Sequence, residues 1–205
     1  MTGTSDLGAA LSATEPIVAA ITGEHWEAPT CCPDWSVHEL LNHLVAGNQF
    51  FAAALTDQAA PDRSANHLAG DPLGAYQRSA TALQAAFAQP GAFDKVISVQ
   101  FGPVPGAVAL HLRLTEILVH AWDLAHAIDH PTSGLPADVA ERELEFSRAA
   151  IANLPVDQRA LAPPQPVGDD APAIDRLAAL LGRPVAGPAS HTPSRATTRR
   201  SPTGS

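Results

Sequence analysis

Proline and glycine divide this chain into segments of helix length, and this punctuation constrains its fold more than any other feature. Between the breaks, apolar residues recur at the three- and four-residue spacing that places them on one face of a helix. This spacing predicts helices at 5–22, 37–56, 72–89, 106–129, 136–153 and 172–181. Residues 94–101 alternate weakly, as expected of one short strand or an extended crossover. The pattern predicts an all-α protein whose helices form an antiparallel bundle.

The second predicted helix has the clearest start signal. Ser36 can cap its first turn, and Glu39, three residues later, can return a hydrogen bond to the Ser36 backbone. Asp71 and Pro72 provide the third helix with an N-cap and a proline at its first position. Pro16 is expected to kink or restart the first helix, because proline lacks the backbone donor.

The length and composition of the chain indicate one domain. With 205 residues, 45% of them apolar, the chain can build one core but not two. We expect residues 1–186 to form the domain and residues 187–205 to be a disordered, low-complexity tail. The apolar stretches are too short to span a membrane, and no secretory signal opens the chain, so a cytoplasmic protein is expected.

The charge balance and the missing motifs exclude several functions. The net charge is −9, and three of the twelve basic residues lie beyond residue 187, so the domain is more acidic still. Nucleic acids and anionic lipids require a basic surface, so neither is an expected partner. The GxGxxG, P-loop, HExxH and GxSxG motifs are absent. Helix faces that stay apolar would allow a homodimer.

The most informative motif lies in the predicted helix 106–129. Glu116, His120 and Asp123 fall within about 60° of one another around this helix, so they form one polar stripe. A carboxylate and an imidazole four residues apart can present two ligands to a divalent metal. The stripe is equally typical of a solvated helix face, and both interpretations stay open. The other side of the helix is expected in the core: Leu118, Ala121, Trp122 and Ala125.

His43 is the third candidate ligand. It lies at the edge of the apolar stripe of the helix at 37–56, where a side chain points into a seam between helices. In that position it is either a hydrogen-bonded core residue or a ligand. With Glu116 and His120 it makes a set of two histidines and one carboxylate, which leaves coordination positions open as catalytic metal sites do.

The other histidines and the cysteines have simpler explanations. His126 and His130 lie at the end of their helix, where they complement the negative end of the helix dipole. Cys31 and Cys32 are adjacent, so a disulfide between them would be strained. We expect both as buried small apolar residues, with a place in a metal site as the alternative. No function is assigned to the remaining histidines: His25, His38, His67, His111 and His191.

Three stretches of the chain also carry a family resemblance. Residues 28–47 are similar to an opening segment TPCPGWSVRDLLNHLVAG, residues 116–125 to a signature ExxxHxWDLA, and residues 173–184 to a closing segment DRLLALLGRDP. These segments are typical of actinobacterial metal-binding proteins related to mycothiol-dependent maleylpyruvate isomerase, in the DinB/YfiT-like superfamily. The chain departs from them at Cys31 and Asp34, where the family has proline and glycine.

The resemblance implies a fold and a metal site. It implies a DinB-like four-helix bundle with extra short helices and a divalent metal between the helices, zinc first, with nickel or iron as alternatives. The ligands would be His43, Glu116 and His120, the residues that the helical pattern also selects. The isomerase has a second, C-terminal domain for which this chain has no room, so maleylpyruvate itself is not the expected substrate.

The resemblance further implies a thiol-dependent reaction. A metal with three protein ligands can bind a low-molecular-weight thiol such as mycothiol and deprotonate it for attack on a small electrophile, in S-transfer or isomerisation. Asp123 is expected to act in catalysis by fixing the His120 tautomer or by orienting the thiol, with a solvated carboxylate as the alternative. Two other functions stay open: a thiol-independent metalloenzyme of specialised metabolism, and a non-catalytic bundle that binds a metal or ligand.

Overall fold

Six α-helices and one β-hairpin make up the computed structural model, which describes residues 3–62, 64–100, 102–153 and 162–185. The predicted all-α fold class is confirmed, and the expected tail at 187–205 lies outside the described residues. The elements in chain order are α1 Thr4–Ala19, the 3-10 helix η1 Gly23–Glu27, α2 Val37–Leu55, α3 Pro72–Phe87, β1 Val96–Val99, β2 Gly102–Pro105, α4 Gly106–Ala127, α5 Ala137–Asn153 and α6 Ala173–Leu180.

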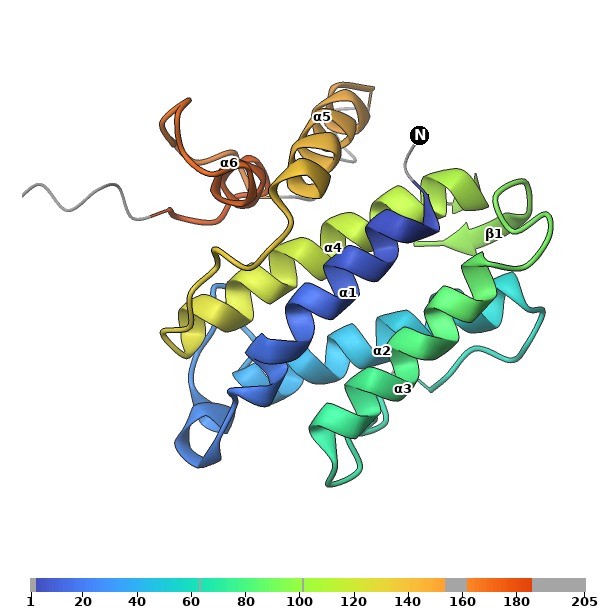
Figure 1. The fold of residues 1–205 in the computed structure, drawn as a ribbon, viewed down its shortest axis with the longest axis horizontal. Helices are drawn as coiled ribbons and strands as arrows, with labels where there is room; N and C mark the ends of the chain where they lie inside the picture. Colours follow the sequence, from blue (N-terminus) through green and yellow to red (C-terminus); the bar gives the residue numbers. More distant parts are fainter. Residues whose placement is uncertain (1–2, 63, 101, 154–161, 186–205) are drawn as a thin grey trace, which may run out of the picture.

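Helices α1 to α4 form the bundle, in which α1 packs against α3 and α4, and α2 packs against the same two helices. Figure 1 shows that α2 and α3 run in one direction and α1 and α4 in the other. The connection at 56–71 makes this possible, because it is long enough to return the chain to the starting end of α2. The buried apolar side chains of the four helices join in one core.

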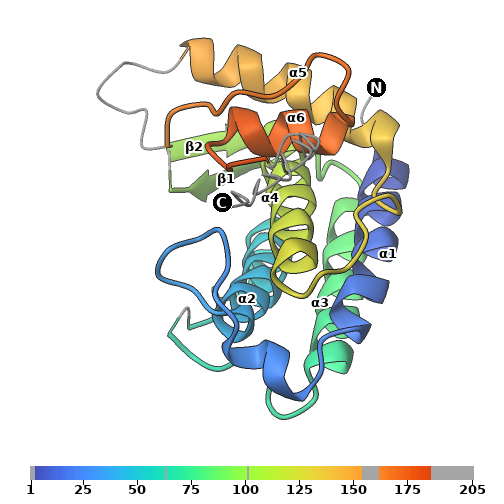
Figure 2. The same ribbon diagram turned by 90° about the vertical axis from the view of Figure 1, so that its left-hand side faces the viewer.

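Helices α5 and α6 lie side by side across α4, outside the bundle (Figure 2). The fully buried Glu143 of α5 lies 2.9 Å from Nδ1 of His111 on α4. The fully buried Trp122 of α4 donates a hydrogen bond of 2.7 Å to Asp175 of α6. With this layer in place, α4 is buried on every side over residues 117–125.

The predicted helix starts are confirmed in detail. The hydroxyl of Ser36 accepts a hydrogen bond from the backbone of Glu39, and the Glu39 carboxylate accepts one of 2.7 Å from the backbone of Ser36. The Asp71 side chain caps α3 by accepting from the backbone of Gly74. Pro16 does not restart α1. It lies in the last turn of that helix, where the loss of one backbone donor interrupts little.

The β-hairpin contains a strand that the sequence pattern misses. The segment at 94–101 was expected to hold one strand, and β1 is that strand, but β2 pairs with it antiparallel, with Ile97 opposite Val104. The sequence does not predict β2, because Pro103 and Pro105 are residues that strands usually exclude. Because they occupy every second position, both can take the ladder positions that pair without backbone hydrogen bonds.

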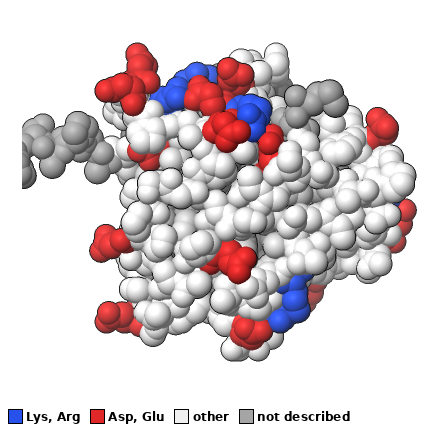
Figure 3. All heavy atoms as spheres, viewed as in Figure 1, with Lys and Arg blue, Asp and Glu red and all other residues white. Residues whose placement is uncertain are grey.

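On the face drawn in Figure 3, Lys and Arg side chains lie beside acidic ones and do not gather into a patch of their own. Within the described residues, none of the helices combines the length and the apolar character that crossing a bilayer requires.

Candidate metal centre

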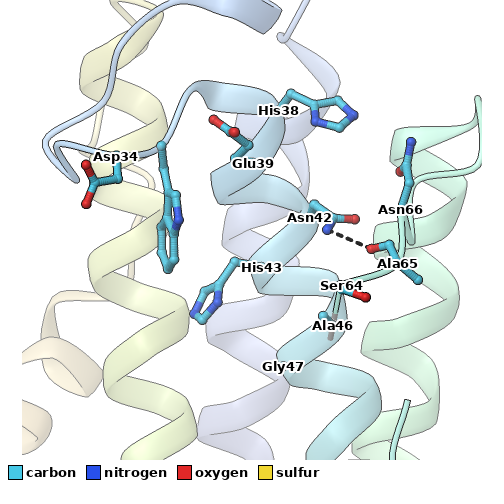
Figure 4. Close-up of a pocket in the computed structure, with 11 residues that line it drawn as sticks. Asp34, His38, Glu39, Asn42, His43, Ala46, Gly47, Ser64, Ala65 and Asn66 are labelled. Atoms are coloured by element: carbon cyan, nitrogen blue, oxygen red, sulfur yellow. Dashed lines mark hydrogen bonds between the residues drawn. The ribbon is translucent and has the colours of Figure 1, made fainter. Parts of the chain in front are cut away.

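Two of the three predicted ligands meet between α2 and α4. The ring centroids of His43 and His120 are 5.2 Å apart, and the two ring planes are nearly perpendicular. Figure 4 shows the His43 ring leaving α2 on the side that faces α4. His120 is only 8% exposed. The helical pattern therefore selected two imidazoles that the fold places next to each other.

Glu116, the third predicted ligand, lies one helical turn before His120. Its carboxylate oxygen Oε2 accepts a hydrogen bond of 2.7 Å from Nη1 of Arg113. Burial alone would raise the pKa of the Glu116 carboxyl, but the charge of Arg113, with smaller contributions from His120 and His43, holds it below its usual value. Glu116 is therefore a charged carboxylate at neutral pH.

Arg113 was not identified from the sequence, although it determines how Glu116 is held. Its guanidinium is fully buried, and besides Glu116 it donates to Oδ1 of Asn48 over 3.0 Å and to the carbonyl of Leu44 over 2.6 Å. Gly47 makes room for this group, because a Cβ at Gly47 would lie 2.8 Å from Cζ of Arg113. One sequence signal could have identified it: Arg113 lies three residues before Glu116, on a helix that is apolar on most sides.

Asp123 contacts the other side of the His120 ring. The Asp123 side chain is fully buried, and its Oδ2 lies 3.1 Å from Nδ1 of His120, which donates because a carboxylate only accepts. Burial would raise the pKa of Asp123, but hydrogen bonds from His120 and Arg183 hold it below its usual value. Asp123 is therefore not a solvated carboxylate. The polar stripe of α4 is not a solvated helix face at Asp123 or at His120, because both side chains are buried.

Arg183 and Cys32 complete the surroundings of Asp123. Arg183 donates from Nε to Oδ1 over 3.2 Å and from Nη2 to Oδ2 over 2.9 Å. The Cys32 thiol lies 3.7 Å from Oδ2 of Asp123. Neither residue was assigned to the site from the sequence, although Arg183 belongs to the closing segment of the family resemblance and a place for Cys32 in a metal site was the alternative considered.

A second group of potential ligands arises here and differs from the predicted one. Among the described residues, the ligand atoms of Cys32, His120 and Asp123 all lie within 4.8 Å of one another, whereas those of His43, Glu116 and His120 do not form such a group. One observation disfavours this group as a cation site. The Arg183 guanidinium already occupies the cationic position beside the carboxylate. In the absence of a metal, burial, with the charge of Asp123, raises the pKa of the Cys32 thiol to about 11.

The loop between η1 and α2 covers the two imidazoles. Thr30 holds this loop by donating a hydrogen bond of 2.8 Å to the carbonyl of Trp35. The Trp35 ring centroid lies 4.5 Å from that of His43 and 6.1 Å from that of His120. In the same loop Cys31 is exposed and Cys32 half-buried. The expectation of two buried cysteines is therefore wrong, because Cys31 is exposed and Cys32 is only partly buried.

A cavity of about 390 Å³ opens beside His43 (Figure 4). Its walls are the first half of α2, the residues Asp34 and Trp35 before it, and the loop at 64–66. Asn42 ties that loop to α2, because it donates to the carbonyl of Ala65 over 3.1 Å and accepts from the backbone of His67 over 2.7 Å. A small molecule in this cavity would reach the His43 side of the centre.

His126 contacts a backbone carbonyl of α4 near the end of that helix, as the simpler explanation predicts, whereas His130 lies beyond the end of α4. The His126 ring stacks on Trp122 with centroids 3.7 Å apart, and its Nδ1 lies 2.9 Å from the Trp122 carbonyl. Nδ1 of His130 lies 2.9 Å from the carbonyl of Pro131.

Comparison with known proteins gives consistent matches. Residues 7–125 match the family model described as mycothiol maleylpyruvate isomerase N-terminal domain. Two uncharacterised proteins of Mycobacterium tuberculosis, from strains CDC 1551 / Oshkosh and H37Rv, are each 32% identical over 179 residues, which is 82% of this chain and 91% of theirs.

The crystal structure of mycothiol-dependent maleylpyruvate isomerase superposes with a TM-score of 0.52 at 18% identity, over 70% of both chains. A point mutant of that isomerase gives 0.50 at 17% identity, over the same shares. At these identities the structural likeness shows a shared fold.

Proposed function

Because this chain belongs to the mycothiol maleylpyruvate isomerase N-terminal domain family, we propose that it is a divalent-metal-dependent enzyme. His43, Glu116 and His120 would hold the metal. The cosubstrate would be a low-molecular-weight thiol of the mycothiol type, which is either transferred to a small electrophilic substrate or used to isomerise it. The matched stretch, 7–125, contains all three proposed ligands and Asp123.

The convergence of His43 and His120 is the observation that carries this proposal. Their ring centroids are 5.2 Å apart, and the charged Glu116 lies one turn from His120. Two imidazoles and one carboxylate are a donor set that suits zinc, with nickel and iron as alternatives, and the set leaves positions open for exchangeable ligands. By the chemistry of their donor atoms, these three residues would suit a catalytic divalent metal.

Each proposed ligand on α4 forms a hydrogen bond with a charged residue on the atom that would not bind the metal. Arg113 takes Oε2 of Glu116, which leaves Oε1 for coordination. Asp123 takes Nδ1 of His120, which leaves Nε2 as the coordinating nitrogen. These hydrogen bonds would orient Oε1 of Glu116 and keep His120 in its Nδ1–H tautomer in the metal-free protein. Partners of this kind increase the metal affinity of a site and fix the orientation of its ligands.

The chain's own residues would prepare the site for a thiol reaction. A divalent metal bound there lowers the pKa of a coordinated thiol, so that thiolate is available at neutral pH. Trp35 covers both imidazoles and excludes water from that side. The cavity beside His43 would admit the substrate. Cys32 is not the nucleophile in this scheme, because burial raises the pKa of its thiol to about 11.

Metal analysis of single variants tests the proposed ligands. Purified protein is loaded with zinc, freed of excess metal and assayed by elemental analysis. We expect about one zinc per chain in the wild type, and loss of tight binding in His43→Ala, Glu116→Ala and His120→Ala. The matched control is His130→Ala, because Nδ1 of His130 lies 2.9 Å from the carbonyl of Pro131, beyond the end of α4. Full zinc retention in all three ligand variants would contradict the proposal.

A cobalt-substituted sample tests the thiol. Addition of mycothiol to the cobalt protein should produce a thiolate-to-metal charge-transfer band, and the same thiol added to His120→Ala protein should not. A cobalt protein that shows no such band, yet turns over electrophilic substrates without thiol, would replace this proposal with a thiol-independent metalloenzyme.

A further inference from the structure

The C-terminal segment of the described chain reaches the candidate metal centre through one side chain, Arg183. We propose that Arg183 is a positioning residue, which holds the Asp123 carboxylate and, through it, the His120 imidazole in the orientation that ligation requires. This inference rests on the proposed metal centre. It concerns a residue beyond the family match, which ends at residue 125.

The contact between Arg183 and Asp123 is a two-point contact. Nε and Nη2 of the guanidinium donate to Oδ1 and Oδ2 over 3.2 and 2.9 Å. A paired contact of this kind fixes the plane of the carboxylate as well as its position. The Oδ2 atom so fixed is the one that lies 3.1 Å from Nδ1 of His120. The direction of the His120 ring is therefore coupled to the placement of Arg183.

The end of α6 determines where Arg183 points. Gly182 ends the helix with a φ of +88°, and a Cβ there would lie 2.5 Å from Cβ of Ala162. The backbone N–H of Arg183 then donates to the carbonyl of Ala178, as in a glycine-terminated helix end. The guanidinium also donates to the carbonyl of Leu181 over 3.0 Å, so the side chain is held before it reaches Asp123.

Helix α6 is itself tied to the helix that carries the ligands. Asp175 in its first turn accepts a hydrogen bond from Trp122, the neighbour of Asp123 on α4. Arg176 forms an ion pair with Glu141 of α5, which joins the two helices of the outer layer to each other and not to Asp123. These contacts make Arg183 and Arg176 a matched pair: both are arginines of the same segment, and only one reaches the site.

Loss of Arg183 would leave Asp123 with weaker partners. Within the part of the chain that the structure describes, the other side chain that donates to Asp123 is the Cys32 thiol, 3.7 Å from Oδ2 and itself 3.6 Å from Arg183. A thiol is a weak donor and contacts one oxygen only. The carboxylate could then rotate, and the His120 ring would lose the fixed acceptor that selects its Nδ1–H tautomer.

The experiment compares Arg183→Gln with Arg176→Gln and uses two readouts. The first is the His120 tautomer in metal-free protein, from long-range ¹H–¹⁵N NMR of the imidazole ring. We expect one Nδ1–H tautomer in the wild type and in Arg176→Gln, and a mixture in Arg183→Gln. The second is zinc affinity by chelator competition, which should fall at least tenfold in Arg183→Gln and stay within twofold in Arg176→Gln.

Two further variants distinguish positioning from a general loss of structure. Arg183→Lys keeps the positive charge but not the two-point contact, so its zinc affinity should lie between those of the wild type and Arg183→Gln. If Arg183→Gln does not fold, Arg183→Lys is used in its place. In an Asp123→Asn background, Arg183→Gln should weaken zinc binding no further, because its effect passes through the carboxylate.

The outcomes separate this inference from the proposed function. A wild type that binds no zinc would overturn the proposed function, while the tautomer comparison in metal-free protein would still decide the role of Arg183. A wild type that binds zinc, together with Arg183 variants that keep both its affinity and its single tautomer, would overturn the inference and leave the proposed function in place.

Discussion

The guanidinium of Arg113 lies directly against the bare backbone of Gly47, and a Cβ on that glycine would come within 2.8 Å of Cζ. Glycine inside a helix costs about 1 kcal/mol relative to alanine, so its presence in the middle of α2 needs a reason. The reason is the buried Arg113, which crosses from α4 at this point to donate to the Leu44 carbonyl and to Asn48.

Gly47→Ala should destabilise the protein by about 1–3 kcal/mol, because the added methyl displaces Arg113 from a packed interior. Urea unfolding measures this. The matched control is Gly8→Ala in α1, where a Cβ would meet only the end of Gln84 at 3.4 Å. That change should be neutral or stabilise by up to about 1 kcal/mol. A Gly47→Ala protein that gains stability would show that Arg113 does not depend on this space.

Arg113→Gln should destabilise the protein by about 2–3 kcal/mol. This is below the cost of breaking a fully buried ion pair, because the Glu116 side chain is 42% exposed. Zinc affinity should fall about 10- to 100-fold, since Glu116 loses the partner that orients it. Chemical denaturation and chelator competition give the two values. Arg78→Gln removes an exposed ion pair with Asp71 and serves as the control, with a change below about 0.5 kcal/mol.

Acid should unfold the metal-free protein partly through Asp123. The pKa of this carboxyl is lower in the folded protein than in the unfolded chain, where it is about 3.9. Its contribution to stability is therefore complete above the unfolded pKa and is lost as the pH falls through the folded pKa. Asp123→Asn should lose less stability than the wild type between about pH 5 and pH 2, as measured by urea unfolding at several pH values. Parallel pH profiles for the two proteins would contradict this.

Trp35 should report metal binding by fluorescence. Its ring lies 4.5 Å from His43, so a bound nickel or cobalt ion should quench its emission strongly. Trp35→Phe should remove most of the quenching. Trp26→Phe should retain it, because Trp26 contacts His38 on the outer side of α2. Equal quenching in both variants would place the metal elsewhere.

The ligand helices could be predicted because their signals are local. Helix periodicity and the capping box of Ser36 and Glu39 fix where α2 begins, and the same periodicity places Glu116, His120 and Asp123 on one side of α4. These patterns depend only on backbone geometry over a few turns. The predicted helices therefore match the structure to within a few residues at each end.

The partners that hold the ligands could not be predicted in the same way. An arginine in a sequence is expected at the surface. Only the packing of α4 against α2 and of α6 against α4 shows that Arg113 is buried, and Arg183 partly buried, beside carboxylates. The burial of Asp123 has the same origin, because the α5–α6 layer comes from residues far along the chain. Long-range contacts of this kind leave no periodic signal in the segments they join.

A crystal structure of the zinc-loaded protein, with anomalous data collected on both sides of the zinc absorption edge, would show whether His43, Glu116 and His120 bind one metal ion. We expect one anomalous peak within about 2.0–2.2 Å of a nitrogen of His43, a carboxylate oxygen of Glu116 and Nε2 of His120. A peak bounded instead by Cys32 and Asp123, or zinc-loaded crystals without a peak between α2 and α4, would contradict it.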